Sequence, residues 1–528
     1  MGADQQERVG LTRRDALKAG TAVAGGVALT GGMLGRALDA MAAPASPGAG
    51  PYGPLLPPDA NGVRLPAGFT SRVVAEVDQL IGPRKYKFHG LPDGMGTYRT
   101  NDGGFILVSN SELPYAPPNW VIGTGAIRFD SRFRITDAYP ILENTMINCA
   151  GGVTPWGTWL SCEEINLGKV FECDPWGEKP SKALPAMGVF KHEAAVIDPV
   201  GRHAFLTEDV QDGCFYRFRP DSYPDLSNGK LDVAEVDLEG KVIWHEVPDP
   251  QPQAGAVPTR NQVPAATRFR RGEGAWYDEG VVYFATTQDN RVHAYHCADE
   301  ELEVIYDGDA LGEAAPLNDS DNVTVSPLSG DLFVCEDAGD LQVCIISPEG
   351  EVAPFLQLPG DEHRNSELTG PVFDPTGRRF YVASQRSTPA GRIFEINGPF
   401  RRTRPEPFPD KAGPAVKVRV LGKPSLRGLS RAGQAFRVIA SDESPPMTID
   451  ARLVASLKRA SGKGSREVTI GSGKVKLGSS GNSLVRIRPN ERMRQRLRLQ
   501  RVVRGKLIVT ATDSKGNRRR IVKPVRFS

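Results

Sequence analysis

The stretch from Gly201 to Pro220 reads GRHAFLTEDVQDGCFYRFRP. It holds a turn glycine, a run of strand-forming residues, an acidic pair and a second strand-forming run. Short runs of β-branched and aromatic residues bounded by Gly and Asp are typical of adjacent strands joined by a short loop. Glu208 and Asp209 fall where the first run ends. The stretch therefore predicts a strand hairpin with carboxylates at one end.

Related patterns occur at six places, and helical periodicity is nearly absent between residues 61 and 400. Six strand-rich repeats predict an all-β fold and a six-bladed β-propeller. Equivalent positions of each blade would lie at one height around the axis, so the acidic strand ends would converge on a cation site. The alternative is a β-sandwich in which these acids are solvated strand ends. The six stretches are GGFILVSNSE (103–112), GTWLSCEE (157–164), GRHAFLTED (201–209), GVVYFATTQD (280–289), GDLFVCED (330–337) and GRRFYVASQ (377–385).

Charge is distributed unevenly along the 528 residues, a length that favours more than one domain. Residues 411–528 contain 29 Lys and Arg against 6 Asp and Glu, a net charge of +23, whereas residues 1–410 have a net charge of −21. The Pro-rich segment 405–415 reads as a linker. We therefore expect a propeller at 46–404 and a small, basic, Ig-like β-sandwich at 416–528.

The first 45 residues resemble a twin-arginine signal peptide. Arg13 and Arg14 precede a Gly- and Ala-rich apolar stretch, and Ala40-Met41-Ala42 forms a small-residue cleavage site. This pattern predicts export by the twin-arginine route to the periplasm, the cell surface or the medium. Disulfides are allowed there, but seven cysteines leave at least one unpaired within a single chain. Cys335 and Cys344 flank a predicted hairpin and could pair across it.

The segment Asn148–Glu164, NCAGGVTPWGTWLSCEE, combines soft and hard metal-ligand types. As a thiolate, Cys149 would suit iron, zinc or copper, while Glu163 and Glu164 would suit calcium, magnesium or ferric iron. From the residues alone, a disulfide partner is a somewhat more common role for Cys149 than a metal ligand. The segment therefore indicates either a stapled loop or a metal site.

The same segment resembles the signature of the PhoX-type alkaline phosphatases, a family of bacterial exported enzymes. Further motifs follow the family's order, and the resemblance spans about residues 61–400. It implies a six-bladed propeller with two ferric ions and calcium ions at the end of its axis, and hydrolysis of phosphomonoesters. The supporting segments are PDGMGTY (92–98), FKHEAAVIDP (190–199), FLTEDVQDGCFYRF (205–218), FRRGEGAWYD (269–278), SDNVTVSP (320–327) and SELTGPVFDPTGRRFYV (366–382).

The resemblance also implies roles for individual residues. Arg271 would bind phosphate oxygens, because a guanidinium fork matches their geometry. The cations would neutralise the phosphate dianion and activate a water molecule. The implied metal ligands are Cys149 as an iron thiolate, Glu164, Glu273, Asp321, and a further carboxylate from Glu193 or Glu208.

Two segments depart from the family's pattern. The chain has Ser111 within Asn-Ser-Glu where the family commonly has Asn-His-Glu, and Arg386 after Gln385 where Gln-His-Pro-Gly is expected. The loss of both histidines puts outer hydrogen bonds, and one metal position, in question.

Two other functions fit a propeller with an acidic centre. One is a non-catalytic, calcium-stabilised propeller that binds a surface ligand, and the other is a calcium-dependent lactonase-like hydrolase; neither needs a soft thiolate such as that of Cys149. The basic C-terminal region suits an anionic cell-envelope polymer or a lipid surface. It lacks the interleaved aromatic residues that stack on bases, which argues against nucleic acid. We expect a monomer.

Overall fold

A computed structural model of the chain separates two compact units, Met1–Thr403 and Arg404–Ser528, which are described separately. The predicted linker lies outside the described residues, as does the predicted signal peptide except at its end. There, Ala45 is buried and its N–H donates to the carbonyl oxygen of Ile305 at 2.7 Å. The described residues are 44–115, 122–388, 391–403, 416–421, 424–440, 447–458, 465–477, 482–498, 500, 502–512 and 518–528.

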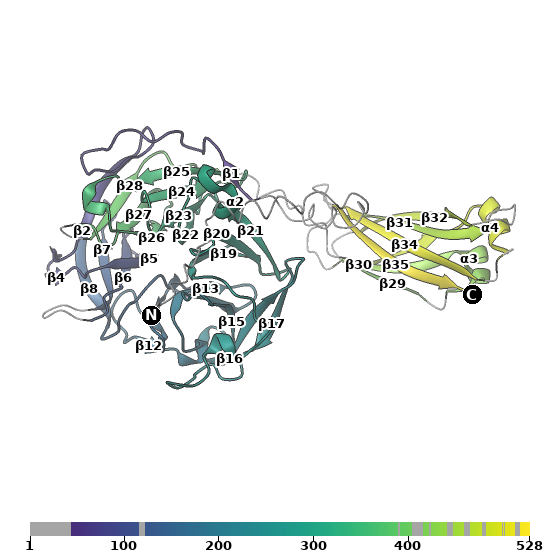
Figure 1. Cartoon of the computed structure of the whole chain (residues 1–528), viewed down its shortest axis with the longest axis horizontal. Helices are drawn as coiled ribbons and strands as arrows, with labels where there is room; N and C mark the ends of the chain where they lie inside the picture. The colour runs from purple at the N-terminus through teal and green to yellow at the C-terminus, as the bar shows by residue number, and fades with distance from the viewer. Residues whose placement is uncertain are drawn as a thin grey trace, which may run out of the picture. The chain divides into compact units, whose positions relative to one another are not determined.

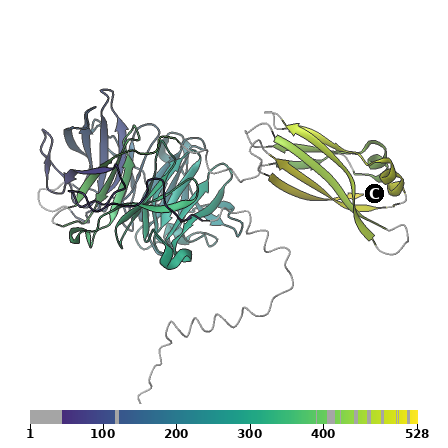
Figure 2. The same ribbon diagram turned by 90° about the horizontal axis from the view of Figure 1, so that it is seen from above.

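The first unit is built from strands, which confirms the predicted all-β class. Its described part contains six sheets of four or five strands, plus the small hairpin of β3 (Leu80–Ile81) and β4 (Tyr86–Lys87). Strands within these sheets pair antiparallel, except that β1 (Ser46–Pro47) runs parallel to β25 (Glu351–Gln357). An isolated bridge between Gly151 and Ala194 is also parallel. Figures 1 and 2 show two views of these sheets.

The first three sheets follow one another along the chain. They consist of β5 (Pro92–Arg99), β6 (Phe105–Ser111), β7 (Gly123–Phe129) and β8 (Ile135–Glu143); β9 (Gly152–Val153), β10 (Trp159–Cys162), β11 (Val170–Cys173) and β12 (Lys182–Ala183); and β13 (His192–Asp198), β14 (His203–Glu208), β15 (Phe215–Ser222), β16 (Asp225–Val236) and β17 (Val242–Glu246).

The last three sheets include the two strands from the start of the unit. They consist of β18 (Gly272–Asp278), β19 (Val281–Thr286), β20 (Arg291–His296) and β21 (Glu301–Asp307); β22 (Ser320–Val325), β23 (Leu332–Glu336), β24 (Gln342–Ile346) and β25 (Glu351–Gln357) with β1; and β26 (Leu368–Phe373), β27 (Arg379–Ser384) and β28 (Arg392–Asn397) with β2 (Thr70–Glu76).

Each of the six sequence repeats supplies the second strand of one sheet and pairs with the strand that follows it. The stretch Gly201–Pro220 forms β14 and most of β15, in which Leu206 lies opposite Tyr216. The other five repeats pair in the same way. The six hairpins predicted from the repeats are therefore confirmed.

The first strands of the sheets are the ones that meet. In chain order, β5 contacts β9, β9 contacts β13, β13 contacts β18, β18 contacts β22, β22 contacts β26, and β26 contacts β5. Close approach requires glycine on these strands. A Cβ atom on Gly94 would lie 1.7 Å from the carbonyl oxygen of Ala150, and one on Gly370, where φ is +57°, would lie 2.6 Å from that of Asp93.

A β-bulge recurs near the start of five of these first strands, namely β5, β13, β18, β22 and β26. In β13, His192 pairs with Glu208 and Ala195 pairs with Leu206, so that Glu193 and Ala194 share one position opposite the partner strand. An extra residue of this kind bends the strand and redirects a side chain. Three further bulges hold Asp93 and Gly94 in β5, Glu273 and Gly274 in β18, and Asp321 and Asn322 in β22, and the fifth holds Gly370 and Pro371 in β26. In four of the five, the first bulge residue is acidic.

The second unit is also all-β. One sheet contains β29 (Val416–Val420), β30 (Gln434–Ala440) and β33 (Asn482–Ile487). The other contains β31 (Met447–Lys458), β32 (Ser465–Leu477), β34 (Val503–Thr512) and β35 (Arg518–Phe527). Buried residues of both sheets, such as Phe436 and Leu507, belong to one apolar core. The helices are α3 (Leu426–Ala432) and α4 (Glu491–Arg498). No helix in the described parts of the chain is both long and apolar enough to cross a membrane.

An ion pair around the buried carboxylate of Glu395 joins the two ends of the first unit. Strand β2 pairs with β28, and Glu395 on β28 accepts hydrogen bonds from Arg72 at 2.7 and 2.9 Å and from the Tyr381 hydroxyl at 2.6 Å. Arg379 also pairs with it. Burial alone would raise the pKa of Glu395, but the hydrogen bonds from Arg72 and Tyr381 lower it below its usual value.

We expect Glu395→Gln to lower the free energy of unfolding of the first unit by roughly 3 kcal/mol at neutral pH, because it leaves a half-buried arginine without its charge partner. A lowered folded-state pKa gives stability that is present above the unfolded-state pKa and is lost as the pH falls through the folded-state value. The difference between variant and wild type should therefore shrink in acid. Urea unfolding at both pH values measures it, with the exposed Glu239→Gln as control. An equal difference at both pH values would contradict this account.

Candidate metal centre

Acidic side chains from several sheets gather in three groups. Within each group, one ligand atom per residue lies within 4.8 Å of the others. Glu193 belongs to the first two groups, so those two form one continuous cluster. In the described residues the groups are Cys149, Glu164 and Glu193; Glu193, Glu273 and Asp321; and Asp93, Glu112 and Glu367.

The third group lies close to the other two. Asp93 acts electrostatically on the pKa of Cys149, of Glu193 and of Asp321, and it raises each of them. Glu367 has the same effect on Asp321. The three groups therefore form one acidic centre at the beginning of the first strands.

Cys149 is the only sulfur ligand in these groups. It precedes β9, is buried, and its N–H donates to the carbonyl oxygen of Cys162 at 2.9 Å. Burial raises the pKa of its thiol well above the usual value, and the charges of Asp93 and Glu193 raise it further. A thiolate at this position therefore needs a cation beside it.

All seven cysteines, each within a described segment, are free. Cys149 is thus unpaired, as the odd cysteine count and the family resemblance suggested. The pairing considered for Cys335 and Cys344 is not formed. Cys335 lies opposite Val343 and Cys344 opposite Val334, so the two thiols enter different apolar cores.

Glu193 provides the strongest sign of a missing partner. It is 1 % exposed, and its Oε1 atom has no hydrogen-bond donor. Burial raises the pKa of Glu193 well above its usual value, and the charges of Glu273 and Glu164 raise it further. A buried carboxylate oxygen without a partner is costly, and a bound cation would satisfy it.

Hydrogen bonds hold the other two carboxylates of the central group in place. The Thr287 hydroxyl donates to Oε1 of Glu273 at 2.6 Å, and the Asn322 amide donates to Oδ1 of Asp321 at 2.7 Å. Burial raises the pKa of both acids well above their usual values. Oriented carboxylates of this kind are typical of metal ligands with supporting outer bonds.

The third group carries its own supporting bonds. The amide of Gln385 donates to Oδ2 of Asp93 at 2.6 Å, and the N–H of Gly94 donates to Oδ1 at 2.6 Å. Burial, together with the charge of Glu112, raises the pKa of Asp93 to about 7. Burial and a hydrogen bond with Asp337 raise the pKa of Glu367 to about 10.

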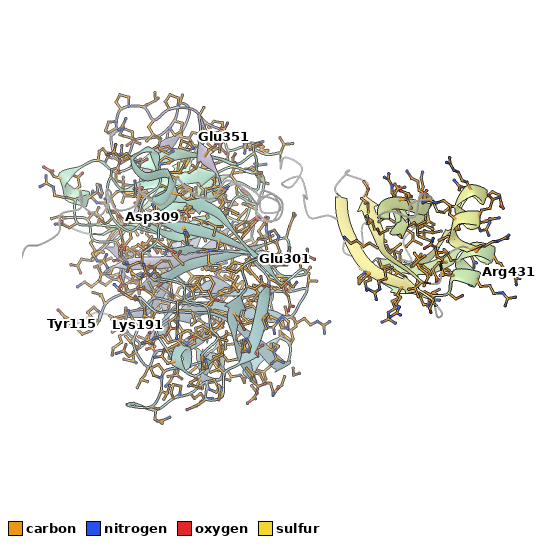
Figure 3. All side chains as sticks on the ribbon, turned by 45° about the vertical axis from the view of Figure 1, so that its right-hand side comes forward. Tyr115, Lys191, Glu301, Asp309, Glu351 and Arg431 are labelled. Atoms are coloured by element: carbon orange, nitrogen blue, oxygen red, sulfur yellow. The ribbon has the colours of Figure 1, made fainter. Side chains whose placement is uncertain are left out.

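Three basic side chains flank the acids. The Arg271 guanidinium contacts Asp209 at 2.9 Å, Asp337 at 3.0 Å and Glu273 at 3.1 Å. Lys191, labelled in Figure 3, contacts Glu164 at 2.8 Å. Arg386 contacts Glu367 and Glu112.

Negative charge exceeds positive charge in this centre. The three groups with Asp209 and Asp337 comprise nine carboxyl groups, whereas Lys191, Arg271 and Arg386 supply three positive charges. A buried excess of this size must be balanced by protons or by cations. Seven of the nine acids, with one thiol, lie in the three groups. This donor set fits hard multivalent cations, and the thiolate fits a softer one such as iron.

Five of the six metal ligands expected from the sequence come together: Cys149, Glu164, Glu193, Glu273 and Asp321. Glu208 does not join them. It accepts hydrogen bonds from the Tyr216 hydroxyl at 2.7 Å and from Arg260 at 3.0 Å. Of the two carboxylates left open by the resemblance, the structure therefore brings Glu193 to the cluster and gives Glu208 another partner.

Sequence reasoning did not name Asp93, Glu367 or Lys191 as residues of the centre. It expected the strand-end acids, among them Glu112, Asp209 and Asp337, to converge on a cation site, and it noted Arg386 only as a departure from the family's pattern. Asp93 lies inside the quoted motif PDGMGTY, and Glu112, Asp209 and Asp337 end repeats that were identified. A usable signal existed in the pairs Asp-Gly, Glu-Gly and Asp-Asn, which mark three of the five bulges of the first strands.

A cavity of about 170 Å³ adjoins the acidic centre along the first strands. Gly94, Gly274 and Asn322, each the second residue of a bulge, line it together with Trp159 and Met95. Its lining is mostly apolar and includes none of the clustered acids. The charged chemistry therefore lies beside this cavity and not within it.

The fold and this centre define an all-β protein with a buried site of carboxylates and one thiol, flanked by arginines. The model of the family described as alkaline phosphatase PhoX matches residues 123–307, a segment that includes Cys149, Glu164, Glu193, Arg271 and Glu273. The match confirms the PhoX assignment predicted from the motifs. It also supports an alkaline phosphatase function, which is that of a phosphate-ester hydrolase.

Other comparisons add little. Among curated proteins, no match to this chain was found. A chain of the Mitotic Checkpoint Complex is 10 % identical, with 65 % of this chain and 96 % of that chain covered and a TM-score of 0.36. A protein of unknown function from Bacteroides thetaiotaomicron is 11 % identical, with 62 % and 76 % covered and a TM-score of 0.37. TM-scores this low do not identify a fold.

Replacing Glu193 should separate a cation-binding role from a structural one. We expect Glu193→Gln to stabilise the chelator-treated protein by about 1–3 kcal/mol, because it removes one of several buried like charges. The same change should reduce the rise in Tm on adding calcium. Thermal unfolding with and without calcium measures both effects.

The matched control is Glu208→Gln, which removes a buried carboxylate that has protein partners. It should lower Tm equally with and without calcium and leave the calcium-induced rise unchanged. Loss of that rise in Glu208→Gln, or its retention in Glu193→Gln, would reverse the assignment of the two residues.

Proposed function

We propose that this protein is an exported, metal-dependent phosphatase that hydrolyses phosphomonoesters, with ferric iron and calcium at the acidic centre. The observation that carries the proposal is the placement of the Cys149 thiol within 4.8 Å of carboxylate oxygens of Glu164 and Glu193, inside the segment matched by the phosphatase family. A soft thiolate among hard oxygens suits iron beside calcium. A calcium-stabilised binding propeller or a lactonase has no need of this thiol.

We further propose that the six sheets are the blades of a β-propeller spanning residues 46–404, and that 416–528 form an Ig-like sandwich. Support for the propeller comes from the first strands, which contact one another in turn and return from β26 to β5. Support for the sandwich comes from the apolar core that its two sheets share. The twin-arginine motif in residues 1–45 supports export.

The proposed chemistry divides between cations and protein. Bound cations would neutralise the phosphate dianion and lower the pKa of a coordinated water. Cys149, Glu164, Glu193, Glu273 and Asp321 would hold them. Arg271 is partly exposed and carries a planar fork of donors that suits the equatorial oxygens of a phosphoryl group. Asp209 and Asp337 orient that guanidinium until substrate arrives.

Cys149→Ser tests the proposal directly. The variant should fold but lose its iron and most of its activity on an aryl phosphomonoester, because a hydroxyl replaces the thiolate. Iron per chain, initial rate and circular dichroism are measured on the same preparation. Cys297→Ser, at a partly exposed cysteine outside the three groups, is the control. Full iron content and rate in Cys149→Ser, or a disulfide at Cys149 in active protein, would refute the proposal.

For the second unit, we propose binding to an anionic cell-envelope polymer or lipid surface. Arginines face each other directly across paired strands, Arg419 opposite Arg437 and Arg504 opposite Arg526, and all four are exposed. Like charges in this position repel one another, and a polyanion would relieve the repulsion. Figure 3 shows the side chains of this unit, including Arg431 on α3.

Truncation after Gly413 should leave the rate on soluble esters intact and abolish salt-sensitive binding to cell-envelope fractions. Co-sedimentation of full-length and truncated protein across a range of ionic strength measures the binding. Equal binding by both proteins at every salt concentration would exclude the second unit as an anchor.

A further inference from the structure

One of the three acidic groups already contains a cation supplied by the chain. Nη1 of Arg386 lies 2.6 Å from Glu367, and Nη2 lies 3.0 Å from Glu112. The backbone N–H of Arg386 donates to the Ser366 hydroxyl at 2.9 Å, which holds the residue in place after β27. The guanidinium therefore bridges two of the three carboxylates in the group.

The first two groups differ from the third in this respect. Lys191 contacts one member, Glu164, and Arg271 contacts another, Glu273. Neither bridges two members of one group, and Oε1 of Glu193, which the two groups share, has no partner. Among the three groups, only the third has a basic side chain that bridges two of its members.

The third group also has a donor set that suits calcium. Besides three carboxylates, it contacts Gln385, which is 1 % exposed and bonds to Asp93 through its amide nitrogen. The carbonyl oxygen Oε1 of Gln385 is buried without a hydrogen-bond partner. Calcium binds carboxylate and amide oxygens together at about 2.3–2.6 Å.

We propose that Arg386 is a built-in counter-cation, which takes the place of a divalent cation in the group formed by Asp93, Glu112 and Glu367. A calcium ion on the same oxygens would lie against the guanidinium, and two like charges at that distance repel strongly. The arginine therefore excludes the ion. The charge of this part of the centre then does not depend on free calcium.

The proposed role of Arg386 concerns the same acidic centre as the proposed phosphatase, but it is tested by calcium binding and not by phosphatase activity. It predicts that removing the guanidinium charge creates a calcium site that the wild type lacks. Arg386→Gln should bind one calcium ion per chain more than the wild type. Adding Asp93→Asn to that variant should remove the extra ion, because it removes one of the three carboxylates.

The measurement is equilibrium dialysis of the full chain against calcium after chelator treatment, with bound calcium counted per chain. Arg386→Lys keeps the positive charge and should retain the wild-type count. Arg364→Gln, which changes an exposed arginine paired with Asp361, should also retain it. Because the result is a difference between variants, it does not depend on phosphatase activity or on how many ions the wild type binds.

An equal or lower calcium count in Arg386→Gln would overturn the inference, and so would an extra ion in Arg386→Lys. If Arg386→Gln is unfolded without calcium, the inference requires calcium to refold it, with the extra ion bound. Failure to refold on adding calcium would count against it.

Discussion

The close approach of the six first strands is the constraint on which the centre depends. Gly94 and Gly370 lie so near to neighbouring backbone that any side chain would collide with it. In the bulge that contains Gly94, the residue before the glycine, which is the first residue of the bulge, is redirected out of the regular alternation of the strand. Asp93, Glu193 and Glu273 occupy this position on three different sheets. Backbone packing thus gathers charges that are far apart in the sequence.

Electrostatics explains why such a gathering implies cations. Folding brings nine carboxyl groups and three basic side chains together, largely out of water. Lys191, Arg271 and Arg386 form ion pairs with other acids of the centre. Glu193, which the first two groups share, has a carboxylate oxygen without any hydrogen-bond donor. Cys149 adds a thiol whose burial disfavours ionisation. Multivalent cations would bind both the free oxygen of Glu193 and the thiolate of Cys149. The match to a phosphatase family fits such cations, which can activate water for the hydrolysis of a phosphate ester.

In the first unit, sequence reasoning located the second strand of each of the six sheets and the third strand of some of them, but not the first strands. The repeats contain long β-forming runs such as HAFLTE, whereas the first strands begin with bulges, which no simple alternation reveals. Motif resemblance therefore identified Glu273 and Asp321, while Asp93 and Glu367 were overlooked. Glu208 was placed among the ligands because its partner, Arg260, lies 52 residues away and has no local signal. The acids at the strand ends also differ in where they lie. Asp289 pairs with Arg291 and is not part of the three acidic groups.

The central claim is that Cys149 and the carboxylates from the first strands share one metal centre. X-ray absorption at the iron edge, on protein purified from its native export route, tests this most directly. The account predicts one sulfur scatterer at thiolate distance among oxygen ligands, and the loss of that sulfur in Cys149→Ser. Bound iron with oxygen and nitrogen neighbours only, unchanged in the variant, would contradict it.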